Sequence, residues 1–457
     1  MTDSVMDRGQ GKAEGTAVTF NHWLLASAAL PRKLYLVKLR LDYGTAGLEA
    51  EIPDRATVIE PAHVQALQDS HSALIDALRR PIGARRLRQH IGNRHSIGIS
   101  VCDFTRPQPR KQMLAAIFEE LGNLPADAFT IFIATGTHRA NTESELVEML
   151  GEEILHKYRV VSHIARDSAT LTHAGETGTG VPVWLNTEWL NCDVRITTGF
   201  VEPHFFAGFS GGPKMAAPGL AGLDTVLTLH DAKRISSPHA TWGITHGNPI
   251  HDDVREIASM TGVDFAIDVT LNREKEITAV FAGDLLMEHR AACEHAKRTA
   301  MQQVDRPFDV VLTTNSGFPL DQNLYQAVKG MSAAAKVIKP GGTIICAAEC
   351  RDGVPEHGSY AEILASADTP AELLAMINSP GYSVPDQWQV QIQAQVQLKA
   401  NVLVHADGLT DSQLRAAHFE PAHDVADAVH LALREAGDGA TLCVLPQGPQ
   451  TIPYLSE

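Results

Sequence analysis

Short apolar stretches alternate along the chain with longer amphipathic ones, which predicts strands joined by helices. Strands are predicted at 34–41, 96–102, 129–134, 160–163, 194–198, 310–313, 343–348, 401–405 and 441–445. Helices are predicted at 109–121, 143–155, 223–234, 249–260, 285–304 and 322–336. Strands separated by helices favour an α/β fold with largely parallel sheets. A hairpin predicted at 269–282 adds an antiparallel part, so we expect mainly parallel or mixed sheets flanked by helices.

The length of 457 residues is more than one compact core needs and predicts two domains, with three as the alternative. A strand–helix–strand pattern restarts after Arg306-Pro307, which follows the long polar segment 285–304. We therefore predict a flexible leader at 1–16, an N-terminal cofactor-binding catalytic domain at 17–300 and a C-terminal α/β domain at 301–440 that closes over the substrate. For the tail, 441–457, a return to the first domain is one option. The active site is expected in the interdomain cleft, near carboxyl ends of strands.

Composition narrows the class of protein. Apolar residues make up 44% and charged residues 20%, as in a soluble globular protein. The formal net charge of -16 disfavours binding to nucleic acid or to an anionic membrane. No apolar run reaches the roughly 18 residues of a membrane span, and the N-terminus has no apolar signal core. Six sparse cysteines, with no second pair near Cys346 and Cys350 to complete a zinc site, fit a reducing compartment. We expect a cytoplasmic protein.

Two motifs follow predicted strands in the first half of the chain. The first is C-D-F-T-R-P, in which Arg106 offers a fork for a carboxylate or phosphate, and Asp103 and Thr105 could bind a cofactor. The alternative is that Asp103 and Thr105 cap the next helix and Arg106 pairs with Asp103. The second motif, A-T-G-T-H-R, places His138 on a glycine-containing loop suited to proton transfer.

The third motif, between positions 199 and 230, combines two histidines, a lysine and the turn G-F-S-G-G-P-K. His204 could act as a base, Lys214 could bond covalently to a cofactor, and His230 could bind a metal. Backbone N–H groups around Ser210, Gly211 and Gly212 could hold an anion, although the pattern is neither a P-loop nor a dinucleotide signature. The alternative for His230 is a histidine that favours the negative end of a helix.

The fourth motif, D-Q-N-L-Y-Q-A-V-K-G, lies at the start of the predicted helix 322–336. Tyr325 and Lys329 are four residues apart and Gln326 and Lys329 are three apart, so they share one helix face. That face could close over a polar acid, or it could simply be solvated.

In order and spacing, these four motifs resemble the nickel-pincer lactate racemase family, over roughly residues 35 to 440. The resemblance implies a nickel-pincer nucleotide, a pyridinium-3-thioamide-5-thiocarboxylic acid mononucleotide, held covalently by Lys214, with His230 as the protein ligand to nickel. It implies His138 and His204 as bases on opposite faces of the substrate and Arg106 as the group that grips its carboxylate. Further expected contacts are Tyr325, Gln326 and Lys329 to substrate, and Asp103, Thr105, Ser210, Gly211 and Gly212 to cofactor. Cofactor maturation enzymes are the implied partners. Pro213, before the lysine, departs from the small residue usual there.

The implied function is a racemase or epimerase that inverts C2 of a 2-hydroxy acid. Hydride leaves C2 as the hydroxyl loses its proton, which gives a 2-keto acid, because a pyridinium-type ring can accept hydride whereas C2 is a weak carbon acid. An aldonic acid C2 epimerase is the alternative within the family. From other classes, a zinc-dependent hydrolase using His138, His204 and His230, or a non-catalytic cofactor carrier, are the alternatives.

Overall fold

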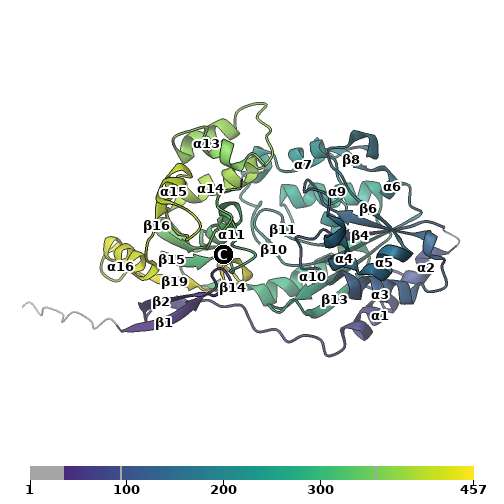
Figure 1. The fold of residues 1–457 in the computed structure, drawn as a ribbon, viewed down its shortest axis with the longest axis horizontal. Coiled ribbons are helices and arrows are strands. Elements are labelled where there is room, and N and C mark those ends of the chain that lie inside the picture. The colour runs from purple at the N-terminus through teal and green to yellow at the C-terminus, as the bar shows by residue number, and fades with distance from the viewer. Residues whose placement is uncertain (1–34, 93–94, 356–357, 457) are drawn as a thin grey trace, which may run out of the picture. The chain divides into compact units, whose positions relative to one another are not determined.

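The computed structural model describes residues 35–92, 95–355 and 358–456. The predicted leader, 1–16, lies outside the described residues. The described residues form two six-stranded sheets. Helices lie against the strands in both halves of the ribbon (Figure 1). This arrangement confirms the predicted α/β class.

The first sheet is parallel except at one edge. Its order is β13 (Ile277–Gly283), β12 (Phe265–Leu271), β9 (Val194–Phe200), β4 (Ile97–Cys102), β5 (Phe129–Ala134) and β6 (Arg159–Ser162). Only β12 and β13 pair antiparallel, which confirms the predicted hairpin. From β4 the chain proceeds outward through β5 and β6, and from β9 it proceeds the other way through β12 and β13. The strand order therefore reverses between β4 and β9, the kind of position where α/β sheets bind ligands.

The second sheet is parallel throughout. Its order is β18 (Glu420–Pro421), β17 (Asn401–His405), β16 (Ile338–Ala347), β15 (Phe308–Thr314), β19 (Leu442–Leu445) and β3 (Thr57–Val58). Side chains along β15 alternate between two cores: Val310 and Leu312 pack with β1, β2 and α16, whereas Val311 packs with α11 and α14. Both faces of this sheet are therefore buried, which explains the continuous apolar run along β15.

The remaining strands form four small pairs. They are β1 (Leu36–Leu41) with β2 (Leu48–Pro53), β7 (Leu171–Glu176) with β8 (Pro182–Asn186), β10 (Pro203–His204) with β11 (Gly208–Phe209), and β14 (Met301–Val304) with β20 (Ile452–Leu455). Among the described residues the longer helices are α1 (Ser70–Arg79), α3 (Arg110–Glu120), α4 (Glu143–Leu150), α9 (Pro249–Thr261), α10 (Leu285–Ala300), α11 (Leu324–Ala334), α13 (Pro370–Ile377), α14 (Gln387–Lys399) and α16 (Val425–Ala436). The shorter ones are α2 (Leu87–Ile91), α5 (Glu152–Lys157), α6 (Thr187–Leu190), α7 (Leu223–Leu229), α8 (Ala232–Ile235), α12 (Tyr360–Leu364) and α15 (Asp411–Ala416). All helices in the described part of the chain are too short or too polar to cross a bilayer.

Three predicted helices are interrupted. The segment 143–155 divides into α4 and α5 at Gly151, which has φ 85°. The segment 285–304 leaves the helix after Ala300 and continues as β14. The segment 223–234 divides into α7 and α8, because His230 ends one helix and Asp231 caps the next through its contact with the Arg234 N–H. His230 is therefore on a turn and not within a helix.

The predicted domain limits stay predictions, but strand pairing bears on two of them. β3, from the predicted first domain, joins the edge of the second sheet beside β19. Both strands of the predicted tail pair with strands that follow residue 300: β19 with β15, and β20 with β14. These pairings tie the tail to the second sheet and not to the first.

Candidate active site

The four motifs start where strands end. Residues 103–107 follow β4, residues 135–139 follow β5, and residues 201–214 follow β9. Since these strands are parallel neighbours with β4 beside β9, their motifs meet at the same sheet edge, at the reversal of strand order. The fourth motif follows β15, between β16 and β19, where the order of the second sheet also reverses.

Asp103 and His138 form a hydrogen-bonded pair across two of these motifs, in which Asp103 is buried and His138 is exposed. The Nδ1 atom of His138 lies 2.8 Å from Oδ2 of Asp103, and Asp103 is only 3% exposed. Burial opposes ionisation of Asp103, but the hydrogen bond and charge of His138, with the charge of Arg106, lower the pKa of Asp103. The ionised carboxylate receives Nδ1–H, so in the neutral form of His138 the lone pair lies on Nε2.

The capping alternative for the first motif does not agree with these contacts. Pro109 is the N-cap of α3, which has no side-chain cap bond. The Thr105 hydroxyl donates to Asp103 at 2.9 Å. Arg106 makes no ion pair among the residues that the structure describes, so its guanidinium is available to a ligand.

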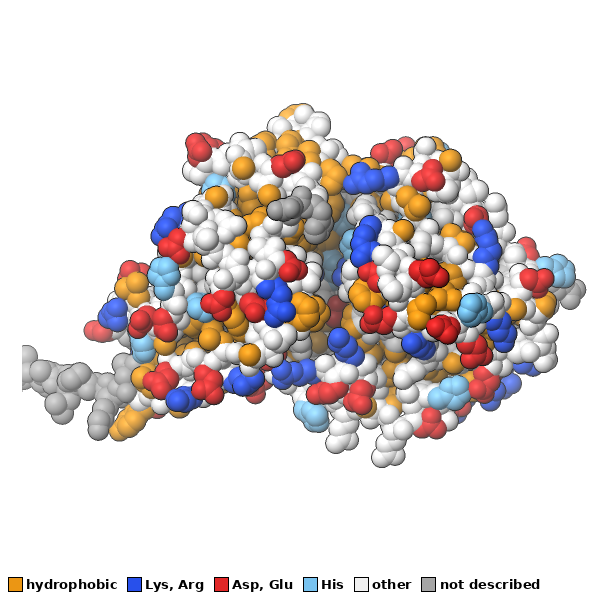
Figure 2. Space-filling model, viewed as in Figure 1, with side chains coloured by type: hydrophobic (Ala, Val, Ile, Leu, Met, Phe, Trp, Pro, Cys, Tyr) orange, Lys and Arg blue, Asp and Glu red, His pale blue; other side chains and the backbone are white. Residues whose placement is uncertain are grey.

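Charges from the separate motifs act on one another. Burial first, then the charge of Arg106, lower the pKa of Lys214 to about 7, while Glu202 opposes the shift. The same causes lower the pKa of Lys329 to about 8. The protein atoms packed around the Glu202 carboxylate limit its hydration and raise its pKa, although the residue is exposed at the surface. The charges of Arg106, Lys329 and Lys214 oppose that rise. The charges of Arg106, Lys214 and Lys329 thus all act on Glu202, and that of Arg106 also acts on Asp103, so the motifs bring together basic groups that suit a small anion. On the face drawn in Figure 2 the surface is hollowed, and Lys, Arg and His side chains lie along the hollow.

His204 has a different environment from His138. Its Nδ1 accepts the backbone N–H of Ala207 at 3.2 Å, with Phe206 N–H at 3.5 Å. Burial, followed by the charges of Lys214 and Lys329, lowers the pKa of His204 well below its ordinary value. The ring is thus neutral with its proton on Nε2. His138 accordingly presents a lone pair at Nε2, whereas His204 presents a proton at Nε2.

His230 is fixed on the turn between α7 and α8 and is 8% exposed. Its Nδ1 lies 2.7 Å from the Val226 carbonyl, so Nδ1 carries the proton and Nε2 the lone pair. The ring meets the edge of Phe206 at 5.1 Å and Trp388 at 4.9 Å between centroids. Burial lowers the pKa of His230 to about 4, which keeps the ring neutral, as a metal ligand must be.

Buried polar side chains hold the loop that carries Lys214. His251 bonds the Ala207 carbonyl at 3.1 Å, His289 bonds the Ser210 carbonyl at 2.9 Å, and Asp268 accepts the Gly212 N–H at 2.7 Å. At Gly212, with φ 51°, an added Cβ would lie 2.3 Å from Cγ of His289. The glycine is therefore required by close packing.

These contacts occupy atoms predicted to seat a phosphate. The Ser210 hydroxyl donates to the Phe200 carbonyl at 2.9 Å, and the Gly212 N–H is held by Asp268. The phosphate role of Ser210, Gly211 and Gly212 stays a prediction, and the contacts of Ser210 and Gly212 do not favour it.

The helix α11 brings its predicted residues to one face. Lys329 donates to Oε1 of Gln326 at 2.7 Å, and its ammonium lies 5.9 Å from the ring centre of Phe205. The indole N–H of Trp388 donates to the Tyr325 hydroxyl at 3.3 Å. Trp388, on α14, thus contacts both Tyr325 and His230. Sequence reasoning missed Trp388 and Glu202, although Glu202 lies two residues before His204 in the third motif.

The fold is that of an α/β protein with two mainly parallel sheets. Comparison with known proteins identifies its family. The lactate racemase N-terminal domain matches residues 43–243, and the lactate racemase C-terminal domain matches residues 303–452. The lactate racemase of Lactiplantibacillus plantarum is 34% identical over 421 residues, which are 90% of this chain and 99% of that protein. The lactate racemase of Thermoanaerobacterium thermosaccharolyticum is 32% identical over 424 residues, 91% and 99% of the two chains.

Solved structures support the same family assignment. The lactate racemase apoprotein from Thermoanaerobacterium thermosaccharolyticum superposes with a TM-score of 0.86 at 31% identity, covering 92% of this chain and all (100%) of that one. A protein from Thermotoga maritima, with a TM-score of 0.64 at 17% identity, shares the fold. The chain belongs to the lactate racemase family, and it is a lactate racemase-like isomerase of the 2-hydroxy acid racemase and epimerase class.

Proposed function

We propose that this protein inverts C2 of a small 2-hydroxy acid by reversible hydride transfer through a 2-keto acid. The observation that carries the proposal is the mutual electrostatic influence of Arg106, Lys214, Lys329, His204 and Glu202, which come from separate motifs. Such a site attracts a carboxylate, and Arg106, which has no ion pair among the described residues, is the group we assign to it. The two named relatives are lactate racemases, so lactate is the first substrate to test.

The two histidines divide the proton chemistry. His138, held by Asp103 through Nδ1, is suited to accept the hydroxyl proton of the substrate at Nε2. His204, neutral and protonated at Nε2, is suited to donate to the substrate oxygen on the other side. Inversion then requires the 2-keto acid to turn between the two rings, so Tyr325, Gln326 and Lys329 would retain it.

The residues present fit the cofactor that the family implies. Lys214 offers an amine whose pKa is lowered to about 7, and a neutral amine is the form that bonds covalently. His230 offers an Nε2 lone pair from a neutral ring, and nickel accepts imidazole nitrogen. When bound, a nickel-pincer nucleotide would supply the hydride acceptor. Lys214 would hold it covalently and His230 would bind its nickel.

The test is production of the protein together with cofactor maturation enzymes, followed by peptide mass spectrometry and chiral chromatography. We expect an adduct on Lys214, racemisation of an enantiopure 2-hydroxy acid, and retention of deuterium from C2 in the product. The Lys214→Arg variant, which keeps the charge, should carry no adduct and show no activity. Full activity without an adduct, or loss of the deuterium to solvent, would refute the proposal.

A panel of enantiopure 2-hydroxy acids separates the lactate hypothesis from the aldonic acid alternative, since the two substrates differ only in chain length and hydroxylation beyond C2.

The zinc hydrolase alternative has less support. Among residues 35–92, 95–355 and 358–456 no group of three or more His, Cys, Asp or Glu side chains is placed to hold a metal ion. That alternative also leaves Lys214 without a role.

A further inference from the structure

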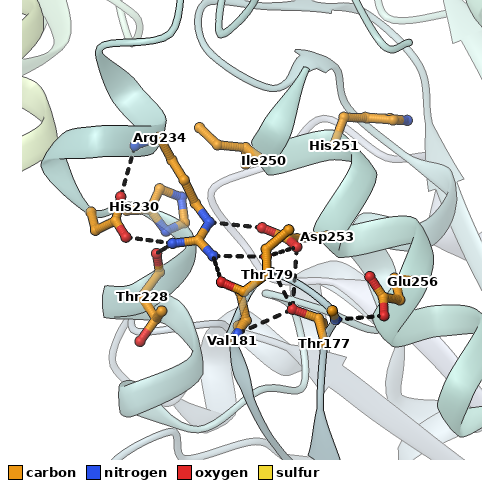
Figure 3. Close-up of polar contacts among 12 residues, drawn as sticks. Thr177, Thr179, Val181, Thr228, His230, Arg234, Ile250, His251, Asp253 and Glu256 are labelled. Atoms are coloured by element: carbon orange, nitrogen blue, oxygen red, sulfur yellow. Dashed lines mark hydrogen bonds and ion pairs between the residues drawn. The ribbon is translucent and has the colours of Figure 1, made fainter. Parts of the chain in front are cut away.

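The turn that carries His230 is anchored by one buried arginine. Arg234 is 8% exposed, and its guanidinium donates in several directions (Figure 3). Nε donates to Oδ2 of Asp253 at 2.7 Å, and one terminal nitrogen donates to the Thr228 carbonyl at 3.2 Å and to Asp231. The other donates to the hydroxyl and carbonyl of Thr179, at 2.9 and 3.2 Å. A guanidinium is required for this pattern, because five acceptor atoms are contacted and a lysine ammonium has only three N–H donors, all on one nitrogen.

These partners belong to three separate parts of the fold. Asp253 lies on α9, Thr179 lies in the turn between β7 and β8, and Thr228 and Asp231 flank His230. Asp253 is 1% exposed and also accepts from Thr177 at 3.2 Å and from Thr179. One side chain therefore attaches the turn to both α9 and the β7–β8 turn.

We propose that Arg234 is a positioning residue for His230. It makes no contact with the imidazole and acts by holding the Thr228 carbonyl on one side of it and the side-chain carboxylate of Asp231, which caps α8, on the other. The turn held in this way sets the 2.7 Å bond between Nδ1 of His230 and the Val226 carbonyl, which in turn reserves the Nε2 lone pair. The importance of that lone pair for nickel rests on the proposed function, whereas the tautomer of His230 does not.

The first experiment uses the apoprotein with nitrogen-15-labelled histidine. A long-range nitrogen–proton spectrum reports which nitrogen of each imidazole is protonated, and His230→Gln identifies the His230 signals by their loss. In the unsubstituted protein we expect a single His230 species protonated at Nδ1. In Arg234→Lys we expect mixed or exchange-averaged signals, with a smaller change in Thr179→Val, which removes one hydroxyl partner and keeps the arginine.

A matched control exists elsewhere in the chain. Nε of Arg79 also donates at 2.7 Å to a carboxylate that is largely buried, that of Glu120, between α1 and α3. Arg79→Lys should lower the thermal midpoint without altering the His230 signals. If Arg234→Lys does not fold, Thr179→Val decides the question. An unchanged His230 spectrum in the folded variants would overturn the proposal.

The second experiment uses the cofactor-loaded protein and a chelator. We expect Arg234→Lys to lose nickel at least several-fold faster than the Arg79→Lys control, while the mass of the adduct on Lys214 stays the same. Equal rates of nickel loss would overturn the link to the metal. Absence of any adduct in the unsubstituted protein would contradict the proposed function and leave the result on the His230 tautomer standing.

Discussion

The lowered pKa of Lys214 predicts an unusually reactive amine in the apoprotein. Burial and the charge of Arg106 bring that pKa to about 7, against the opposing charge of Glu202. An ordinary lysine, with a pKa of about 10.4, is neutral to only about 0.04% at pH 7. With a pKa of about 7, roughly half of the Lys214 amines are neutral, which is about a thousand-fold more. Since only the neutral amine attacks an electrophile, Lys214 should be modified first near neutral pH.

Two substitutions should change the pKa of Lys214 in opposite directions. Glu202→Gln removes the neighbouring carboxylate and should lower the pKa of Lys214 further, whereas Arg106→Gln removes a cation and should raise it. Two unit charges roughly 10 Å apart in a medium of effective dielectric near 20 interact by about 1.7 kcal/mol, or about one pH unit, which we take as the scale for a neighbouring charge at this site. The midpoints for the two variants should therefore differ by about two pH units.

The assay is brief labelling of the apoprotein with an acylating reagent between pH 5.5 and 10, followed by peptide mass spectrometry. The exposed Lys275 serves as the internal reference. Labelling of Lys214 should rise with a midpoint near pH 7 and shift in opposite directions in the two variants. A midpoint above about pH 9.5, or one that neither substitution moves, would refute the electrostatic argument.

Four further predictions follow from the same contacts. Asp103→Asn should lower kcat about 10²- to 10⁴-fold in the loaded enzyme with little change in KM, because the tautomer of His138 is no longer enforced. Arg106→Lys should mainly raise KM, since a point charge replaces a two-point grip. Trp388→Phe should raise KM about five-fold, in line with one lost hydrogen bond of about 1 kcal/mol to Tyr325. Lys214→Met should raise the thermal midpoint of the apoprotein at pH 6. Because the folded state binds fewer protons than the unfolded state between about pH 7 and 10.4, this gain should shrink as the pH rises through that window.

The strands and motifs of the first sheet could be predicted because both depend on local pattern. The segment 129–134 is apolar at nearly every position and forms β5 with the predicted bounds. The motif that follows it must then lie at the carboxyl end of a parallel strand, as His138 does. What the sequence does not contain is the order of the strands, which puts β4 beside β9 and so brings Asp103 and His138 near the loop of Lys214. That order depends on long-range packing.

The helix α14 shows why Trp388 was missed. Its sequence, Q-W-Q-V-Q-I-Q-A-Q-V-Q-L-K, alternates polar and apolar residues with a period of two, as a strand does. The structure buries polar and apolar sides alike: Gln391 donates to the Ala232 carbonyl at 2.9 Å and Gln393 donates to the Ala417 carbonyl at 2.8 Å. The side-chain N–H groups of these buried glutamines donate to distant carbonyls, which overrides the local pattern, and only the fold supplies those carbonyls.

The charge of the site is opposite to that of the whole protein, and this difference has a physical consequence. The chain carries a formal net charge of -16, whereas the charges of Arg106, Lys214 and Lys329 all act on Glu202, and that of Arg106 also acts on Asp103. Burial first, and then the charge of Arg106, lower the pKa of both lysines, so keeping these lysines charged costs free energy. A bound carboxylate or phosphate relieves part of that energy and gains affinity from it. The acidic surface meanwhile repels anions elsewhere, so electrostatics concentrates anionic ligands at this one site.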